Sequence, residues 1–180
     1  PITLKLLGRH NVINAVAAAA ASMEGGAKLN HVKEGLESLS PVSGRLTPLL
    51  GLNHCRILDD TYNASPTSFR AAIDALMSFS GQKILLAGDM RELGIETEKL
   101  HKEIGKYAAQ AGVDELWAVG ALSEFTAQGF GGKARHFDDM QKLIDTCRSS
   151  ASSSLVFLVK GSRGSHMELV VNSLTMKEGE

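Results

Sequence analysis

The sequence predicts an α/β fold: a mostly parallel sheet with helices on both faces, preceded by a short helical segment. Short apolar segments alternate with amphipathic ones along most of the chain. Two apolar runs, ILLA at 84–87 and LVFLV at 155–159, lack polar alternation, which is typical of strands buried on both faces. The first 40 residues instead carry two helical patterns.

Two helices are expected before the first strand. Residues 10–23 are rich in alanine, the strongest helix former, and Gly25–Gly26 ends this helix. A second, shorter helix is expected over Leu29 to Leu39, with its apolar residues on one side. The following SPVSG segment at 40–44 has the composition of a linker.

Six apolar segments after the linker are expected to form strands. They are Leu46–Leu50, Cys55–Leu58, Lys83–Ala87, Glu115–Val119, Ala134–Phe137 and Leu155–Val159. The buried centre of the sheet is expected to include Ile84, Leu85, Val156 and Leu158.

Amphipathic segments between the strands are expected to form helices. Ser65 and Pro66 form a typical helix start, with serine as the cap and proline in the first turn. Thr97 and Asp138 are expected to cap two later helices. The remaining two are a short helix that carries Leu122 and Phe125, and a last helix from Ser165 to Met176.

Composition excludes several classes of protein. The net charge is −1, from 19 basic and 20 acidic residues, so there is no electrostatic footprint for nucleic acid. No apolar run approaches the roughly 18 residues that cross a bilayer, and no signal peptide is visible. Cys55 and Cys147 form no CxxC or metal pattern, so we expect reduced core residues of a cytoplasmic protein.

Polar segments stand at the ends of three expected strands: Asp59–Asp60, Gly88–Asp89 and 160–163. Ligands of open α/β sheets bind at the carboxyl ends of strands. An aspartate there can hold ribose hydroxyls or a metal, or it can simply cap a turn. The 160–163 segment can bind a carboxylate or phosphate through its arginine, or it can be a solvated basic loop.

His10, Asn11 and Asn14 lie on one side of the first expected helix, because spacings of three and four share a face. Amide side chains offer a donor and an acceptor together, which suits an adenine edge. The alternative is that Asn11 only caps the helix. His101 is expected to be a surface residue.

These polar segments, in this order, resemble the C-terminal part of the Mur ligases of peptidoglycan synthesis. The matching segments are GRHNVINAVAAAA (8–20), PVSGRL (41–46), DDTYNASPTS (59–68), LLAGDMRELG (85–94) with HKEIG (101–105), and LVKGSRGSHME (158–168). GDMRELG and KGSR point to the branch that adds D-alanyl-D-alanine to UDP-N-acetylmuramoyl-tripeptide.

The resemblance implies three domains: one that binds the UDP-sugar, a central ATPase with a P-loop and a modified lysine that handles Mg²⁺, and a Rossmann-like domain that closes over ATP and the dipeptide. Residues 1–41 would be the helical tail of the ATPase domain, and 42–180 the C-terminal domain. The other parts would lie upstream. This chain alone would be inactive, with no catalytic residue and no metal ligand of its own.

The resemblance also implies residue roles. His10, Asn11 and Asn14 would border the adenine of ATP, Arg45 would reach the phosphates after closure, and Asp60 would hold the ribose. The residues expected to bind the peptide substrates are Asn63, Ser65, Asp89, Glu92, Lys160, Ser162 and Arg163. The tripeptide carboxylate would be activated as an acyl phosphate, which the dipeptide amine attacks.

Two other functions remain open at this point. A ligase like folylpolyglutamate synthetase would share the mechanism but would use glutamate, and GDMRELG and KGSR argue against it. A free-standing nucleotide-binding module would leave the N-terminal helix pair unexplained, and the chain lacks a GxGxxG segment after a first strand.

Overall fold

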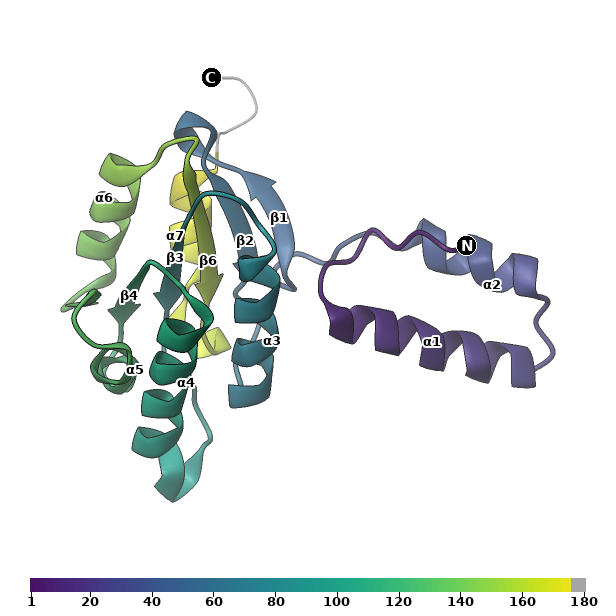
Figure 1. Cartoon of the computed structure of the whole chain (residues 1–180), viewed down its shortest axis with the longest axis horizontal. Helices are drawn as coiled ribbons and strands as arrows, with labels where there is room; N and C mark the ends of the chain where they lie inside the picture. Colours follow the sequence, from purple (N-terminus) through teal and green to yellow (C-terminus); the bar gives the residue numbers. More distant parts are fainter. Residues whose placement is uncertain (176–180) are drawn as a thin grey trace.

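A computed structural model describes residues 1–175 and contains a six-stranded sheet in that part of the chain, in the order β1-β2-β6-β3-β4-β5 (Figure 1). The strands are β1 (Thr47–Leu50), β2 (Arg56–Asp60), β3 (Gln82–Ala87), β4 (Glu115–Val119), β5 (Ala134–Phe137) and β6 (Leu155–Lys160). Only the edge strand β1 pairs in antiparallel fashion. The predicted mostly parallel sheet is therefore confirmed.

Helices cover both faces of the sheet, as predicted. The α-helices of residues 1–175 are α1 (Arg9–Glu24), α2 (Leu29–Ser38), α3 (Pro66–Met77), α4 (Thr97–Ala111), α5 (Ser123–Phe130), α6 (Met140–Ser150) and α7 (Glu168–Leu174). The first core cluster joins α3, α4 and α5 to one face, and the second joins α6 and α7 to the other. The α1–α2 hairpin projects sideways from this layered body (Figure 1).

The centre of the sheet is the core of the molecule. Strand β6 lies between β2 and β3, and all six of its residues are buried. Ile84, Leu85, Val156 and Leu158 are each at most 1% exposed, which confirms the predicted core. Leu85 and Leu158 face the α3–α4–α5 cluster, whereas Ile84 faces the α6–α7 cluster.

Two strands extend further at their carboxyl ends than the sequence predicted. Asp59 and Asp60 belong to β2 and Lys160 belongs to β6, because the parallel ladder continues through the pairs Asp59–Val159 and Asp60–Lys160. Apolar composition marks only the part of a strand that packs into the core, and backbone pairing does not require it. The polar side chains therefore start from a rigid sheet edge.

Both later helix caps were predicted one residue from their observed positions. Thr97 is the first residue of α4 rather than its cap, and its hydroxyl donates to the carbonyl of Gly94 at 2.7 Å. Asp139, not Asp138, caps α6, and its carboxylate accepts from the Lys142 amide at 2.8 Å. Adjacent polar residues carry the same local signal, and only the backbone angle selects between them.

The last helix starts later than predicted. Residues Arg163–Ser165 form a 3₁₀ turn, and His166 adopts a left-handed backbone with φ of 51°, which interrupts any helix from Ser165. The α-helix runs over Glu168–Leu174. Met176, the predicted end of this helix, lies outside the described residues.

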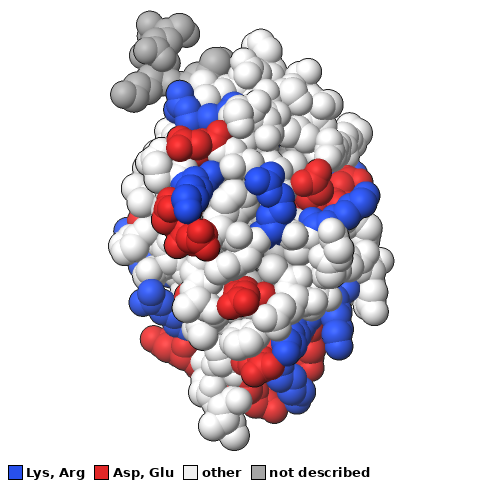
Figure 2. Space-filling model, turned by 90° about the vertical axis from the view of Figure 1, so that its left-hand side faces the viewer, with Lys and Arg blue, Asp and Glu red and all other residues white. Residues whose placement is uncertain are grey.

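Surface and cysteine positions agree with an ordinary folded domain. On the face that Figure 2 shows, acidic and basic side chains are interspersed, without a large area of one sign. No helix within residues 1–175 is long and apolar enough to cross a membrane. Cys55 and Cys147 are buried and unpaired, and burial raises the pKa of the Cys147 thiol to about 12.

Candidate functional site

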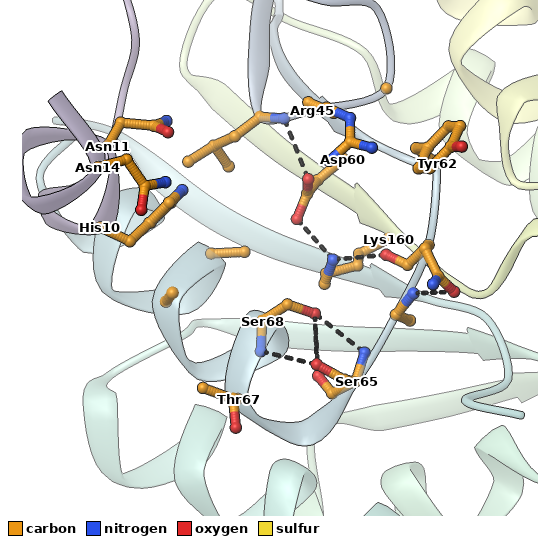
Figure 3. A pocket seen from close by; sticks show the side chains of 16 residues that line it. His10, Asn11, Asn14, Arg45, Asp60, Tyr62, Ser65, Thr67, Ser68 and Lys160 are labelled. Atoms are coloured by element: carbon orange, nitrogen blue, oxygen red, sulfur yellow. Dashed lines mark hydrogen bonds and ion pairs between the residues drawn. The ribbon is translucent and has the colours of Figure 1, made fainter. Parts of the chain in front are cut away.

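A cavity of about 460 Å³ lies between α1 and the carboxyl ends of β2 and β6 (Figure 3). Most of the predicted site residues line it, from segments far apart in the sequence: His10, Asn11, Asn14, Arg45, Asp60, Asn63, Ser65 and Lys160. Residues of the α1–α2 hairpin and residues at the carboxyl ends of the strands therefore line the same cavity.

The α1 wall consists of His10, Asn11 and Asn14, which point toward the cavity (Figure 3). The alternative that Asn11 caps α1 is wrong, because the cap position is Gly8, with φ of 91°. The Asn11 amide nitrogen instead donates to the carbonyl of Leu7 at 2.7 Å. This bond fixes the amide plane of a side chain that borders the cavity.

Asp60 and Lys160 form the floor of the cavity. The Lys160 Nζ is 2.6 Å from Oδ2 of Asp60, donates to the carbonyl of Asn63 at 2.9 Å, and lies 5.4 Å from the centre of the Phe69 ring. Burial lowers the pKa of the Lys160 ammonium, and the Asp60 carboxylate opposes that shift. Lys160 is 1% exposed, so the alternative of a solvated basic loop is wrong for this residue.

The start of α3 forms another wall. Ser65 caps the helix as predicted, since its hydroxyl accepts from the Ser68 amide at 3.2 Å. Asn63 lies in the loop between β2 and α3, and its side-chain oxygen accepts from the Ala64 amide at 2.8 Å. Thr67 and Ser68 also line the cavity, and our sequence analysis missed them. The signal was available, because a helix N-terminus attracts anions and its first turn follows Ser65.

Arg45 lies at the mouth of the cavity and is exposed. Its guanidinium carbon is 4.3 Å from the centre of the Tyr62 ring, in cation–π geometry. Tyr62 lines the same cavity and was also missed by the sequence analysis. The ring packs against the guanidinium, a planar donor that suits a phosphate or carboxylate.

Four predicted site residues do not line this cavity. Asp89 Oδ1 accepts from the amides of Leu122 and Ser123 at 3.0 and 2.8 Å, and so binds the start of α5. Glu92 is exposed, with φ of 64°. The remaining two are Ser162 and Arg163.

Ser162 connects two of the loops at the carboxyl edge of the sheet. Its amide donates to the Asp89 carbonyl at 2.8 Å, and its hydroxyl accepts from the Arg91 amide at 2.9 Å. Ser162 is buried, whereas Arg163 is exposed and lines a separate cavity of about 160 Å³ beside Asp59. Ser162, Arg163 and Asp89 therefore form a second cluster of polar residues next to the main cavity.

His101 is fully buried, so the predicted surface position is wrong. Its Nε2 lies 3.0 Å from the Met90 amide, and its Nδ1 lies 2.8 Å from the Thr97 carbonyl. This arrangement requires a neutral ring with the proton on Nδ1, and burial lowers the pKa of His101. The signal was its spacing of three and seven residues from Ile104 and Ala108, which are on the buried face of α4.

Comparison with known proteins gives consistent results. A family model described as "Mur ligase, glutamate ligase domain" matches residues 44–163. The chain is 43% identical over 177 residues to the UDP-N-acetylmuramoyl-tripeptide–D-alanyl-D-alanine ligase of Escherichia coli K12. The match covers 96% of this chain and 38% of that protein. The chain thus spans about two fifths of its relative's length.

Solved structures agree with this match. A crystal structure of MurF from Acinetobacter baumannii superposes with a TM-score of 0.86 at 35% identity, over 95% of this chain and 38% of that one. The MurF ligase of Thermotoga maritima, solved in complex with ADP, superposes with a TM-score of 0.82 at 27% identity, over 93% of this chain and 38% of that one.

Proposed function

Because the chain belongs to the Mur ligase family, we propose that it is the C-terminal part of an ATP-dependent ligase that adds D-alanyl-D-alanine to UDP-N-acetylmuramoyl-tripeptide. The observation that carries the proposal is the cavity itself. It brings together His10, Asn11 and Asn14 from the hairpin, Arg45 from the linker, and Asp60 from the sheet edge.

The chain would contribute two parts to the full-length enzyme. Residues 1–41 would be the tail of the upstream ATPase domain, and residues from 42 onward the C-terminal domain. The exposed apolar side chains of α1 support this division, because Val12, Ile13 and Val16 are each more than half exposed. The Thr47 hydroxyl in β1 donates to the Val42 carbonyl at 2.7 Å, and this bond links residue 42 to the sheet.

The cavity would hold ATP between these two parts. His10, Asn11 and Asn14 would border the adenine, where amide groups supply both a donor and an acceptor. Asp60 would accept from ribose hydroxyls, and Arg45 would approach the phosphates from the cavity mouth. The ADP complex of the Thermotoga maritima relative supports a nucleotide as the occupant.

The peptide substrates would meet the remaining polar residues at the sheet edge. Asn63, Ser65 and Lys160 would contribute from the main cavity, with Lys160 acting through its bond to the Asn63 carbonyl. Asp89, Glu92, Ser162 and Arg163 would form the adjoining dipeptide side. The exposed guanidinium of Arg163 suits the dipeptide carboxylate.

The reaction would proceed in two steps. The terminal carboxylate of the tripeptide would take the γ-phosphoryl group of ATP, which leaves ADP and an acyl phosphate. The dipeptide amine would then attack the acyl carbon, forming the amide and releasing phosphate and a proton. Acyl phosphates hydrolyse readily, so closure of the C-terminal domain would exclude water before the first step.

Magnesium would be held outside this chain. Residues 1–175 contain no group of three or more histidine, cysteine, aspartate or glutamate side chains arranged for a metal. Asp60 is the only carboxylate among the described residues that line the main cavity, and it bonds to Lys160 and to the Leu46 amide. As the family resemblance implies, the ion would bind to the upstream ATPase domain. The two buried, unpaired thiols favour a cytoplasmic location.

The test is ADP release by the full-length enzyme with UDP-N-acetylmuramoyl-tripeptide and either D-alanyl-D-alanine or glutamate. Release that depends on D-alanyl-D-alanine supports the proposal. Release with glutamate and a folate would move the chain to the folylpolyglutamate synthetase class, and no release with either would contradict both. Arg45→Ala should raise the KM for ATP and leave the fold intact, whereas Ile95→Ala, at a fully exposed position, is the matched control.

A further inference from the structure

Two adjacent carboxylates hold the linker segment Ser43–Leu46 at two backbone amides. Asp59 Oδ2 accepts from the Gly44 amide at 2.9 Å, and Asp60 Oδ1 accepts from the Leu46 amide at 3.0 Å. Arg45 lies between these two attachment points. Its position at the cavity mouth therefore depends on bonds that its own side chain does not make.

The backbone of this linker segment needs such support. Gly44 has φ of 76°, and a Cβ atom there would lie 3.1 Å from the Tyr62 amide nitrogen. Leu46 has φ of 53°, a left-handed conformation that leucine rarely adopts. Strained conformations of this kind persist where surrounding contacts enforce them. Three hydrogen bonds enforce this conformation: the two to Asp59 and Asp60, and one from the Tyr62 amide to the Gly44 carbonyl at 3.0 Å.

Asp59 binds the backbone of the linker segment and does not contact the main cavity. It is 4% exposed and does not line that cavity. Its other oxygen, Oδ1, accepts from the Thr61 hydroxyl at 2.7 Å, which fixes the carboxylate plane. The two oxygens thus join the linker segment to the end of β2.

We infer that Asp59 is a positioning residue for Arg45: through the Gly44 amide it holds the linker segment so that the arginine stays over the Tyr62 ring, at the cavity mouth. This inference rests on the proposed role of Arg45 with the phosphates of ATP. Asp60 makes the second attachment and also faces the cavity. Its carboxylate would therefore bind both the Leu46 amide and the ribose of ATP.

The experiment compares variants of the full-length enzyme by the KM for ATP and by kcat. Asp59→Ala is expected to raise the KM for ATP at least fivefold, in step with Arg45→Ala. The double variant is expected to be no worse than Arg45→Ala, because one residue acts through the other. Asp59→Asn keeps an acceptor for the Gly44 amide and is expected to recover most of the wild-type KM.

Asp114→Ala is the matched control, since the Asp114 carboxylate also accepts from a backbone amide, that of Lys83 at 2.7 Å, at the amino ends of β3 and β4. It is expected to lower stability without changing the KM for ATP. If Asp59→Ala and Arg45→Ala have additive effects, or if Asp114→Ala raises the KM equally, the inference is overturned.

Hydrogen exchange separates this inference from the proposed function. The Gly44 amide is expected to exchange at least tenfold faster in Asp59→Ala than in Asp114→Ala. Unchanged exchange would overturn the attachment itself. An unchanged KM in Arg45→Ala, with faster exchange in Asp59→Ala, would instead reject the proposed role of Arg45 and leave the attachment established.

Discussion

Lys160 and Asp60 are 100 residues apart in the sequence, yet the lysine Nζ lies 2.6 Å from Oδ2 of the aspartate in an ion pair at the end of two neighbouring strands. The lysine side chain is 1% exposed and the aspartate side chain 15%. The pair connects β6 to β2, and through the Asn63 carbonyl to the loop that starts α3.

Removal of the lysine charge should destabilise the domain. Lys160→Met is expected to lower the free energy of unfolding by about 3 kcal/mol, because it leaves the Asp60 carboxylate unpaired in a largely buried site. Urea denaturation, followed through the fluorescence of the single tryptophan, Trp117, measures this. The double variant Lys160→Met with Asp60→Asn should recover part of the loss, and a double variant as unstable as the single one would contradict the pairing argument.

The central strand should be sensitive to truncation. Leu158→Ala is expected to cost about 2–5 kcal/mol, because Leu158 is fully buried in β6 and its removal leaves a cavity. The same urea denaturation applies. Ile95→Ala is the control, since Ile95 is fully exposed and its truncation should change stability by less than about 0.5 kcal/mol. Equal effects of the two variants would rule out the central position of β6.

Stability should fall as the solution becomes acidic, partly through His101. Burial lowers the pKa of His101 in the folded state, so the unfolded chain binds its proton first. Stability from this group is complete above the unfolded pKa of about 6.5 and is lost as pH falls from there toward the folded pKa, by at most about 1.4 kcal/mol per pH unit.

The variant His101→Gln tests this dependence, because glutamine does not titrate and can accept from the Met90 amide. Its free energy of unfolding should decline less steeply between pH 7 and pH 5 than that of the wild type. His31→Gln, at an exposed position on α2, should keep the wild-type slope. A wild-type slope in His101→Gln would remove His101 from the acid response.

A glycine allows α4 to contact α5 closely. A Cβ atom on Gly105 would collide with the carbonyl oxygen of Thr126 and lie 2.6 Å from the Phe130 amide nitrogen. Gly105→Ala is therefore expected to cost about 1–3 kcal/mol through overpacking. Gly35→Ala in α2 is the matched control, since no atom beyond its chain neighbours and the nearby backbone of its own helix lies within 4 Å of the added methyl, and it should stabilise by about 0.4–1 kcal/mol. A neutral Gly105→Ala would mean that the two helices can separate freely.

Local signals were enough to predict much of the fold. Ser65 and Pro66 start α3 as predicted, because a cap and a preset φ act within one turn. The ILLA and LVFLV runs identified β3 and β6, because burial on both faces removes polar alternation. The cap predictions at Thr97 and Asp138 were one residue away, since neighbouring polar side chains carry equal local preference.

Contacts between distant segments could not be predicted in this way. The partner of Lys160 depends on the register between β2 and β6, which pairs Asp60 directly with it. The burial of His101 depends on where α4 packs against the loop that contains Met90. The left-handed backbone of Leu46 could not be predicted from its neighbours in the sequence, because the Asp60 carboxylate that binds its amide belongs to β2.

The sequence by itself thus determined the elements, the central strands and the segments that carry polar site residues, since capping, periodicity and apolar runs act over a few neighbouring residues. The tertiary structure decided which of those residues line the same cavity and which ones bind backbone amides instead. It also decided the position of Arg45 at the cavity mouth. The physical reason is that these contacts join segments up to 100 residues apart, and sheet register and helix packing bring them within hydrogen-bond distance.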